Sequence, residues 1–185
     1  MRFQVKGKLG IKLNNKKIKI GVLGGSFDPA HRGHLAISKE AAKKFKLKHV
    51  IWAITRKNPF KKKSSINLST RIKHCKKIIG KINFIKVKFY EDKIKSNKTI
   101  NLINHLIKNK KNEIYFLMGA DNLINFHKWH KWKTISQKSN IVVFDRYGYK
   151  KKSLNSKTFK ILNKKSLKFI EFNKVNISSS QLRKI

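Results

Sequence analysis

Residues 18–23 read Ile-Lys-Ile-Gly-Val-Leu, and Gly24–His34 follow directly as Gly-Gly-Ser-Phe-Asp-Pro-Ala-His-Arg-Gly-His. A short aliphatic run, a glycine turn and then polar residues that can open a helix are typical of a phosphate-binding strand–loop–helix unit. His31 and His34, three residues apart, should share a face on the first turn of that helix. Their side chains and the exposed backbone N–H groups would then converge on one anion. The stretch therefore predicts a nucleotide site and candidate catalytic groups together.

Each piece of this stretch also has a simpler interpretation. Gly24-Gly25 alone can be a turn, and Asp28-Pro29 alone can be a turn or a helix start. A single histidine is more often a surface or packing residue than a catalytic one. The spacing matches neither the Gly-x-Gly-x-x-Gly of a dinucleotide loop nor the Gly-Lys-Ser/Thr of a P-loop. The prediction rests on the combination of these residues.

The composition is strongly basic. The 185 residues include 47 Lys and Arg against 8 Asp and Glu, which gives a formal net charge of +39. Such a charge favours nucleic-acid binding, and a basic nucleic-acid-binding module is one alternative function. The lysines are, however, spread over the whole chain among many Asn and Ile residues, so a bias of the coding genome explains them equally well. We predict no specific nucleic-acid partner, only non-specific attraction to phosphates.

The few acidic and cysteine residues exclude several classes of site. Eight acidic residues argue against a carboxylate metal cage and against paired-carboxylate hydrolysis, so no protein metal ligands are predicted. The single cysteine, Cys75, excludes an internal disulfide, fits a reducing compartment and lies at helical spacing with Ile72 and Ile79, as a core residue would. No apolar run approaches the roughly 18 residues of a membrane span, and residues 1–17 lack the apolar segment of a secretory signal. The prediction is a cytoplasmic protein with no membrane partner, a flexible basic leader over 1–17 and one domain over 18–185.

Strand-like and helix-like segments alternate after the leader. The predicted strands are 18–23, 49–54, 84–89, 114–118, 141–144 and 167–172. Helices are predicted over 34–45, from a cap at Ser69 to 79, and over 99–108. Trp-rich helical sequence lies between 118 and 141, and a final helical turn is predicted at 178–183. The segment 147–165 is predicted as a loop or irregular helical excursion. Continuously apolar strands alternating with helices predict an α/β fold: a single-domain, Rossmann-like parallel sheet with helices on both faces and right-handed crossovers.

Two further stretches carry candidate binding groups. Ile177–Arg183 read Ile-Ser-Ser-Ser-Gln-Leu-Arg. The serines alone are ordinary helix caps, but with Arg183 one turn later they can form a phosphate clamp. Phe116–Leu123 read Phe-Leu-Met-Gly-Ala-Asp-Asn-Leu, and Phe126-His127-Lys128-Trp129 follow shortly after. Gly119 at a strand end permits close approach to the backbone, and Asp121 can accept hydrogen bonds from a ribose. A lone tryptophan such as Trp129 is more often a packing residue.

These three stretches together resemble the bacterial nicotinate-nucleotide adenylyltransferase family of the nucleotidyltransferase superfamily. The first is similar to the signature Gly-(Ser/Thr)-Phe-Asp-Pro-x-His-x-Gly-His, the second to Ile-Ser-x-(Ser/Thr)-x-(Ile/Leu)-Arg, and the third to Gly-Ala-Asp-Asn-Leu with Phe-x-x-Trp. The resemblance covers the chain from about residue 18 to its end. It implies adenylyl transfer from ATP to nicotinate mononucleotide, giving deamido-NAD and pyrophosphate, with Mg²⁺ arriving with ATP. Another adenylyltransferase of this fold, with nicotinamide mononucleotide or phosphopantetheine as acceptor, is the alternative, and a homo-oligomer is left open.

The resemblance also implies roles for individual residues. It makes His31, His34 and Arg183 catalytic. The expected ATP-binding residues are Gly24, Gly25, Ser26, Phe27, His31, His34, Gly119, Asp121, Ser179, Ser180 and Arg183. The expected nicotinate mononucleotide-binding residues are Asn58, Lys61, Lys62, Thr99 and Trp129, with the Trp129 ring stacked on the pyridine. The Tyr-Thr pair of the family corresponds here to Lys98-Thr99, so a lysine replaces the tyrosine.

Overall fold

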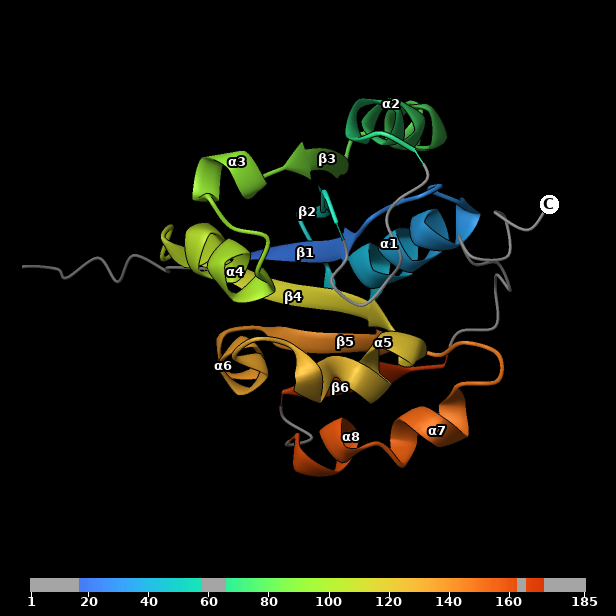
Figure 1. Cartoon of the computed structure of the whole chain (residues 1–185), viewed down its shortest axis with the longest axis vertical. Coiled ribbons are helices and arrows are strands. Elements are labelled where there is room, and N and C mark those ends of the chain that lie inside the picture. Colours follow the sequence, from blue (N-terminus) through green and yellow to red (C-terminus); the bar gives the residue numbers. More distant parts are fainter. Residues whose placement is uncertain (1–16, 58–65, 163–165, 172–185) are drawn as a thin grey trace, which may run out of the picture.

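A computed structural model describes residues 17–57, 66–162 and 166–171 as one sheet and the helices that cover it (Figure 1). Several predictions fall outside these ranges and are not tested by the structure. They are residues 1–16 of the leader predicted over 1–17, the binding residues predicted between 58 and 62, the end of the last predicted strand at Phe172, and the final turn at 178–183.

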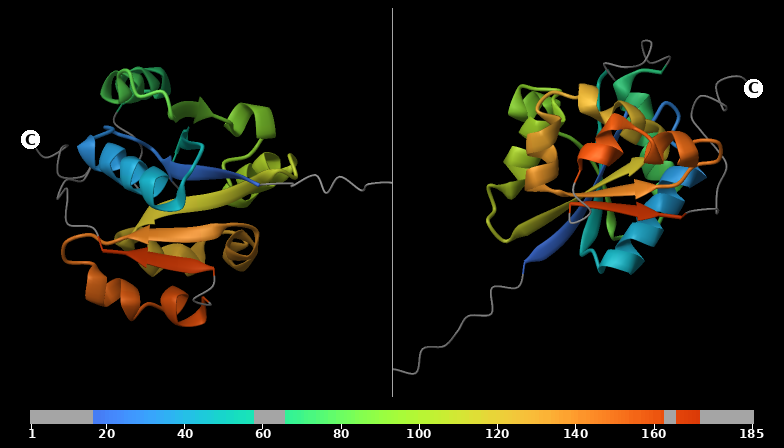
Figure 2. Two further views of the ribbon diagram at one scale, coloured as in Figure 1. Left: turned by 180° about the vertical axis from the view of Figure 1, so that it is seen from behind. Right: turned by 90° about the horizontal axis from the view of Figure 1, so that it is seen from below.

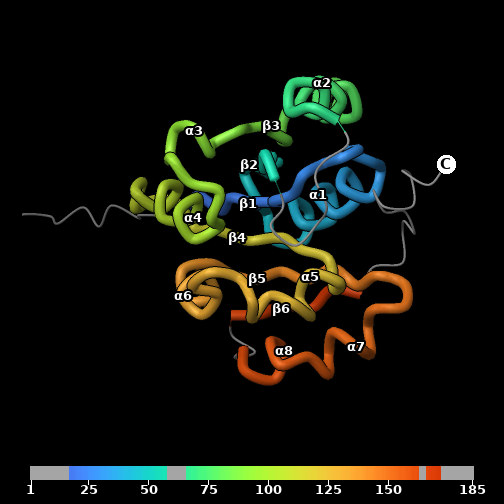
Figure 3. Tube along the Cα trace, in the orientation of Figure 1, coloured from blue at the N-terminus to red at the C-terminus, as the bar shows by residue number. Residues whose placement is uncertain are grey.

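Six parallel strands form the sheet in the order β3-β2-β1-β4-β5-β6. Their bounds are β1 (Ile18–Gly25), β2 (His49–Ile54), β3 (Ile85–Phe89), β4 (Asn112–Gly119), β5 (Asn140–Phe144) and β6 (Leu167–Ile170). In Figure 3 the colours run from blue at the centre to green at one edge, then from yellow at the centre to red at the other. The chain order therefore reverses between β1 and β4, and the carboxyl ends of these two strands mark the usual ligand site of such a sheet. The predicted Rossmann-like α/β fold is confirmed.

Helices cover both faces of the sheet, as the apolar strands predict. The helical elements are α1 (Arg32–Phe45), α2 (Leu68–Ile79), α3 (Glu91–Ile94), α4 (Thr99–Ile107), α5 (Ala120–Asn125), η1 (Phe126–Lys128), α6 (Trp132–Lys138), α7 (Lys150–Leu154) and α8 (Lys157–Ile161).

Successive strand residues pack on opposite faces of the sheet. On one face Ile51 and Phe116 join α4, α5 and α6 in a buried cluster. On the other, Trp52 and Leu117 pack with α1 and α2. The view from behind in Figure 2 shows α1 lying across this second face. Both faces of the sheet are therefore buried, and its strand ends remain as the place for a ligand site.

The loop after β1 differs from the prediction in one respect. Gly24 and Gly25 do not form a turn, because they are the last residues of β1 and pair in register with Ala53 and Ile54. The chain turns instead at Asp28-Pro29, which is joined by a cis peptide bond. Extended glycines at a strand end leave backbone rather than side chains at the edge of the sheet, where a ligand can approach closely.

The start of α2 is also corrected. The helix begins at Leu68, and its N-cap is Asn67, whose Oδ1 accepts a hydrogen bond from the Thr70 N–H at 2.8 Å. Ser69, the predicted cap, donates its hydroxyl to the same Asn67 Oδ1 at 2.9 Å. Asn and Ser are both good caps, so local preference alone does not select between them.

The described residues also test the predictions for Cys75 and for the segment 147–165. Cys75 is fully buried on α2, and burial raises the pKa of its thiol to about 12, which fits the predicted core role. The segment predicted as a loop or irregular helical excursion contains the short helices α7 and α8. Among the helices in the described part of the chain, none is long and apolar enough to cross a membrane.

Candidate active site

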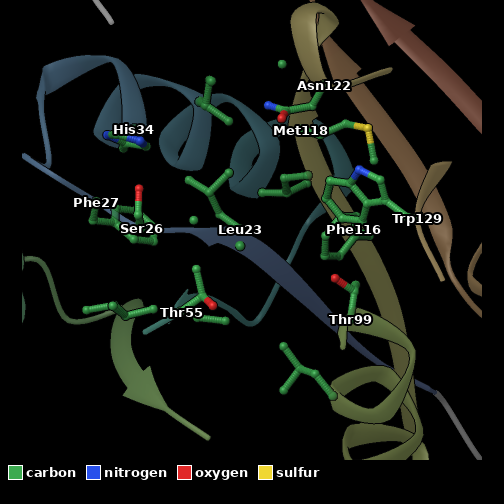
Figure 4. A pocket seen from close by; sticks show the side chains of 18 of the residues that line it. Leu23, Ser26, Phe27, His34, Thr55, Thr99, Phe116, Met118, Asn122 and Trp129 are labelled. Carbon is green, nitrogen blue, oxygen red and sulfur yellow. The ribbon is translucent and has the colours of Figure 1, made fainter. Parts of the chain in front are cut away.

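A cleft of about 700 Å³ lies at the carboxyl ends of β1, β2, β4 and β5 (Figure 4). Ten residues that the sequence assigned to ATP or nicotinate mononucleotide line this one cleft: Gly24, Gly25, Ser26, Phe27, His31, His34, Thr99, Gly119, Asp121 and Trp129. Residues spread over about a hundred positions in sequence are therefore brought together at the point where the strand order reverses.

The other six predicted site residues lie outside the described ranges. They are Asn58, Lys61, Lys62, Ser179, Ser180 and Arg183. Their roles stay predictions that rest on the sequence motifs.

The two histidines are joined through the backbone of the first turn of α1. His31 is the N-cap of α1 rather than a residue of its first turn, and its Nδ1 accepts from the Gly33 N–H at 3.1 Å. The Nδ1 of His34 accepts in return from the His31 N–H at 3.2 Å, and the two ring centroids are 3.8 Å apart. This is a reciprocal capping box with histidines in both roles. Because each Nδ1 is an acceptor, the proton of each neutral ring belongs on Nε2.

An aromatic wall supports His34. The Phe27 ring centroid lies 4.7 Å from that of His34 and is stacked on Trp52 at 5.0 Å. Phe27 is 1% exposed and has a φ of +48°, a left-handed conformation that is unusual for an aromatic residue. The loop is therefore shaped to bury this ring, and Phe27 supports the cleft mainly from within the core.

An ion pair stands at the β4 and β5 ends. Arg146 donates to Asp121 Oδ2 at 2.7 Å, and both side chains are about a quarter exposed. A Cβ added at Gly119 would lie 2.5 Å from Asp121 Oδ1, so Gly119 makes room for this carboxylate. Arg146 was not predicted from the sequence. Its position two residues after a buried parallel strand is the signal that could have identified it, because ligand sites lie at those strand ends.

Thr99 and Trp129 lie at the end of the cleft away from His34 (Figure 4). Trp129 follows η1 and makes edge-to-face contacts with Phe116 and Phe126 at 6.0 and 5.3 Å between ring centroids. Thr99 is the first residue of α4, and its N-cap, Lys98, makes no side-chain capping bond within the described residues. This helix start, with its N–H groups and partial positive charge, therefore borders the cleft, and such a start favours a negatively charged group.

A buried arginine fixes the loops that hold these groups. Arg71 is 2% exposed, and its guanidinium donates to the carbonyl oxygens of Ser26, Thr55 and Arg56 at 2.5, 2.9 and 3.2 Å, and from Nε to Ile66 at 3.1 Å. Burial lowers the pKa of this guanidinium, which still carries its charge. Arg71 was not predicted from the sequence, although a basic residue at helical spacing with Cys75 on the apolar side of a helix is a recognisable signal.

Replacing Arg71 with lysine should lower kcat/KM by about tenfold, because an ammonium cannot reach four carbonyls on two loops and the bonds lost are charge-assisted. The melting temperature should fall by several degrees, at about 2–4 °C per kcal/mol for a chain of this size. Steady-state kinetics and thermal unfolding measure the two effects. Arg56→Lys, at a mostly exposed pair with Asp92, is the matched control and should change little. Unchanged activity and stability of Arg71→Lys would show that the hydrogen bonds of the Arg71 guanidinium are not required.

Comparisons with known proteins agree on one family. A family described as cytidylyltransferase-like matches residues 22–185. A probable nicotinate-nucleotide adenylyltransferase of Pelagibacter ubique (strain HTCC1062) is 69% identical over 173 residues, which cover 94% of this chain and 96% of that protein. Another, from Agrobacterium fabrum, is 35% identical over 70% of both chains. Among solved structures, a Plasmodium falciparum nicotinic acid mononucleotide adenylyltransferase complexed with NaAD superposes with a TM-score of 0.73 at 21% identity, covering 90% of this chain and 82% of that one.

Proposed function

The chain belongs to the nicotinate-nucleotide adenylyltransferases of the cytidylyltransferase-like family, and on this premise we propose that its cleft transfers the adenylyl group of ATP to nicotinate mononucleotide. The products are deamido-NAD and pyrophosphate. The observation that carries the proposal is that one cleft brings two groups of residues together. His31 and His34, which cap α1, lie at one end, and the Trp129 ring lies beside the start of α4 at the other.

The reaction is an in-line displacement at the α-phosphorus of ATP. A phosphate oxygen of the mononucleotide forms a new bond to this phosphorus, and the bond from it to the bridging oxygen of the β-phosphate breaks with release of pyrophosphate. No protein nucleophile takes part. The protein has to bring two anions together and stabilise the charge that develops on the transferring and leaving phosphates.

The groups around His34 suit this task. With their protons on Nε2, His31 and His34 are hydrogen-bond donors for phosphate oxygens, and His34 acts on the charge of the transition state. The backbone of Gly24, Gly25 and Ser26 borders the same space. Side-chain donors held by helix capping need little reorganisation during the reaction, which is the condition for strong electrostatic stabilisation.

Other groups in the cleft suit the ribose of ATP and the pyridine of the mononucleotide. A carboxylate has lone pairs for several donors, so Asp121 can accept from the ribose of ATP while Arg146 holds its Oδ2. Trp129 stacks on the pyridine ring, and the α4 start at Thr99 receives its carboxylate. Outside the described residues, the motif match assigns Asn58, Lys61 and Lys62 to the mononucleotide phosphate. It assigns Ser179, Ser180 and Arg183 to the β- and γ-phosphates.

Magnesium enters this scheme with ATP. Among the described residues, no three His, Cys, Asp or Glu side chains gather to hold a metal ion. The donor set of the cleft thus suits a Mg²⁺ that is coordinated mainly by phosphate oxygens and water. When bound, the ion neutralises part of the phosphate charge.

The direct test is incubation with ATP and a single acceptor, followed by measurement of pyrophosphate and of the dinucleotide. Nicotinate mononucleotide should yield both products in equal amounts, and phosphopantetheine neither. Transfer to phosphopantetheine alone would assign the chain to another adenylyltransferase. If DNA binding vanishes with added salt while adenylyl transfer persists, the alternative of a nucleic-acid-binding module is excluded.

Arg183→Lys tests the proposed phosphate clamp. Lysine keeps the charge but loses the bidentate fork, so the KM for ATP should rise by about tenfold, the equivalent of one charge-assisted hydrogen bond. Initial rates over a range of ATP concentrations measure this, with Lys184→Ala as the control for loss of a neighbouring charge. A KM for ATP equal to that of the wild type would mean that the motif acts only as a helix cap.

A further inference from the structure

A tryptophan lies beneath the proposed catalytic histidine. Trp52 is in the middle of β2, opposite Leu23 of β1, and is fully buried on the face that α1 covers. Its ring is stacked on Phe27, with an angle of 17° between the planes, and its centroid is 5.9 Å from that of His34. A central strand residue is thus in contact with both the loop after β1 and the first turn of α1.

A directed chain of hydrogen bonds joins the indole to His34. Trp52 Nε1–H donates to Ser38 Oγ at 2.8 Å, and the Ser38 hydroxyl donates to the His34 carbonyl oxygen at 2.8 Å. An indole nitrogen can only donate and a carbonyl oxygen can only accept, so the direction of both bonds is fixed. Ser38 is itself fully buried, four residues after His34, where its side chain faces that carbonyl.

Core packing alone does not require these polar groups. Serine is a poor residue for a helix interior, and a hydroxyl bonded to the carbonyl four residues earlier tends to bend the helix. A buried indole N–H also needs an acceptor, which phenylalanine would not. What the hydrogen-bonded pair adds is a fixed distance between β2 and the first turn of α1.

We propose that Trp52 and Ser38 are positioning residues for His34 in adenylyl transfer. His34 is then held at three places: Nδ1 by the His31 N–H, the ring by tilted contacts with Phe27 and Trp52, and the carbonyl by Ser38. Together these contacts orient the Nε2–H towards the phosphates. The inference rests on the proposed function, in which His34 donates to the reacting phosphates.

Kinetics of two variants test the proposal. Ser38→Ala and Trp52→Phe should each lower kcat by about tenfold through misplacement of His34, with both KM values within about twofold of the wild type. Ser139→Ala is the matched control, because the Ser139 hydroxyl makes the same type of bond, to the Ile135 carbonyl at 2.7 Å, at the end of α6. An unchanged kcat in both folded variants, or an equal loss in Ser139→Ala, would overturn the proposal.

The His34→Ala background separates positioning from general weakening. If Ser38 acts through His34, adding Ser38→Ala to His34→Ala should leave kcat unchanged within about twofold, because residues that act as a unit are not additive. A further tenfold loss in that background would show that Ser38 acts independently of the histidine and would refute the proposal.

Nuclear magnetic resonance gives a readout that does not depend on turnover. The His34 ring resonances should shift in Ser38→Ala, which leaves every aromatic ring near His34 in the chain, and not in Ser139→Ala, and the Trp52 indole proton should move upfield in Ser38→Ala. If the wild type transferred no adenylyl group, the proposed function would fail while these shifts would still show the coupling. Unmoved His34 resonances in folded Ser38→Ala would refute the positioning role, whatever the enzyme catalyses. Thermal unfolding of each variant establishes that it is folded.

Discussion

Replacing His34 with alanine is expected to lower kcat by about a hundredfold or more, with little change in the KM for ATP. A preorganised donor aimed at developing charge contributes about 3–4 kcal/mol to the transition state and much less to the ground state. His34 meets this description, because its Nδ1 caps α1 and its ring is held against Phe27 and Trp52. Single-turnover measurements with saturating ATP isolate the chemical step.

Two further variants sharpen this test. His34→Gln keeps an oxygen that can accept from the His31 N–H and an N–H that can donate to a phosphate, but it lacks the rigid imidazole ring, so its kcat should lie between those of the wild type and His34→Ala. His74→Ala, on α2, removes a histidine that does not line the cleft and should keep wild-type activity. Turnover of His34→Ala close to the wild-type rate would mean that the histidine only caps the helix, and the proposed mechanism would be wrong.

The sequence predicts the sheet well because its strands carry their own signal. Runs such as 50–54 are apolar throughout, as expected for strands buried on both faces, and β2 has the predicted bounds, 49–54. The helix starts are harder, because Asn67 and Ser69 offer the same capping chemistry within three residues. The glycine pair was misassigned for a related reason. Gly24-Gly25 suits a turn, but pairing with β2 extends the strand through it.

The residues of the candidate site likewise divide into those that the sequence identifies and those that it does not. Contiguous motifs identified His31, His34, Asp121 and Trp129, because their chemistry can be read from neighbouring residues. Arg71 can be recognised locally as a basic residue on the apolar side of a helix, but its bond to the Ser26 carbonyl, 45 residues away, cannot be predicted from neighbouring residues. The Trp52–Ser38 and Arg146–Asp121 contacts likewise join different elements, and no local pattern predicts such pairings.

The composition shows that acidic side chains are scarce, but it does not show where they lie or what they bind. Three of the eight, Glu91, Asp121 and Asp145, line the cleft. Glu91 accepts from the Thr55 hydroxyl, Asp121 from the Arg146 guanidinium, and Asp145 from the Arg146 N–H. Glu91 and Asp121 hold cleft loops in place through donors on other elements, whereas Asp145 accepts from the next residue of its own loop. In a chain of net charge +39, most of the acid at this site therefore has a structural partner.

Removal of the Trp129 ring tests the proposed pyridine site. Trp129→Ala should weaken binding of both nicotinate and nicotinamide mononucleotides by about 1–3 kcal/mol, the range found for a base stacked on an aromatic side chain. Trp132→Ala is the matched control, since its ring contacts Phe126 edge-to-face and does not line the cleft. Acceptor KM values measure the effect. Equal losses in the two variants would indicate general damage to the η1 region rather than loss of stacking.

Acceptor preference is the expected result most specific to this site. The value of kcat/KM for nicotinate mononucleotide should exceed that for nicotinamide mononucleotide by about a hundredfold or more, at one salt concentration. The acid carries a carboxylate where the amide is neutral, and the start of α4 offers backbone N–H groups and a partial positive charge. A site that satisfies one acceptor leaves polar groups of the other unpaired, which supports discrimination of several kcal/mol.

Lys98 decides how far charge contributes to this preference. It lines the cleft at the N-cap of α4, and its ammonium adds attraction for the carboxylate. Lys98→Met should therefore lower the ratio of the two kcat/KM values by about fivefold without reversing it, because the helix N–H groups remain. Lys95→Met, on the preceding turn and outside the cleft lining, controls for loss of a nearby charge. Equal kcat/KM values in the wild type, or a preference for the amide, would overturn the proposed acceptor while leaving adenylyl transfer intact.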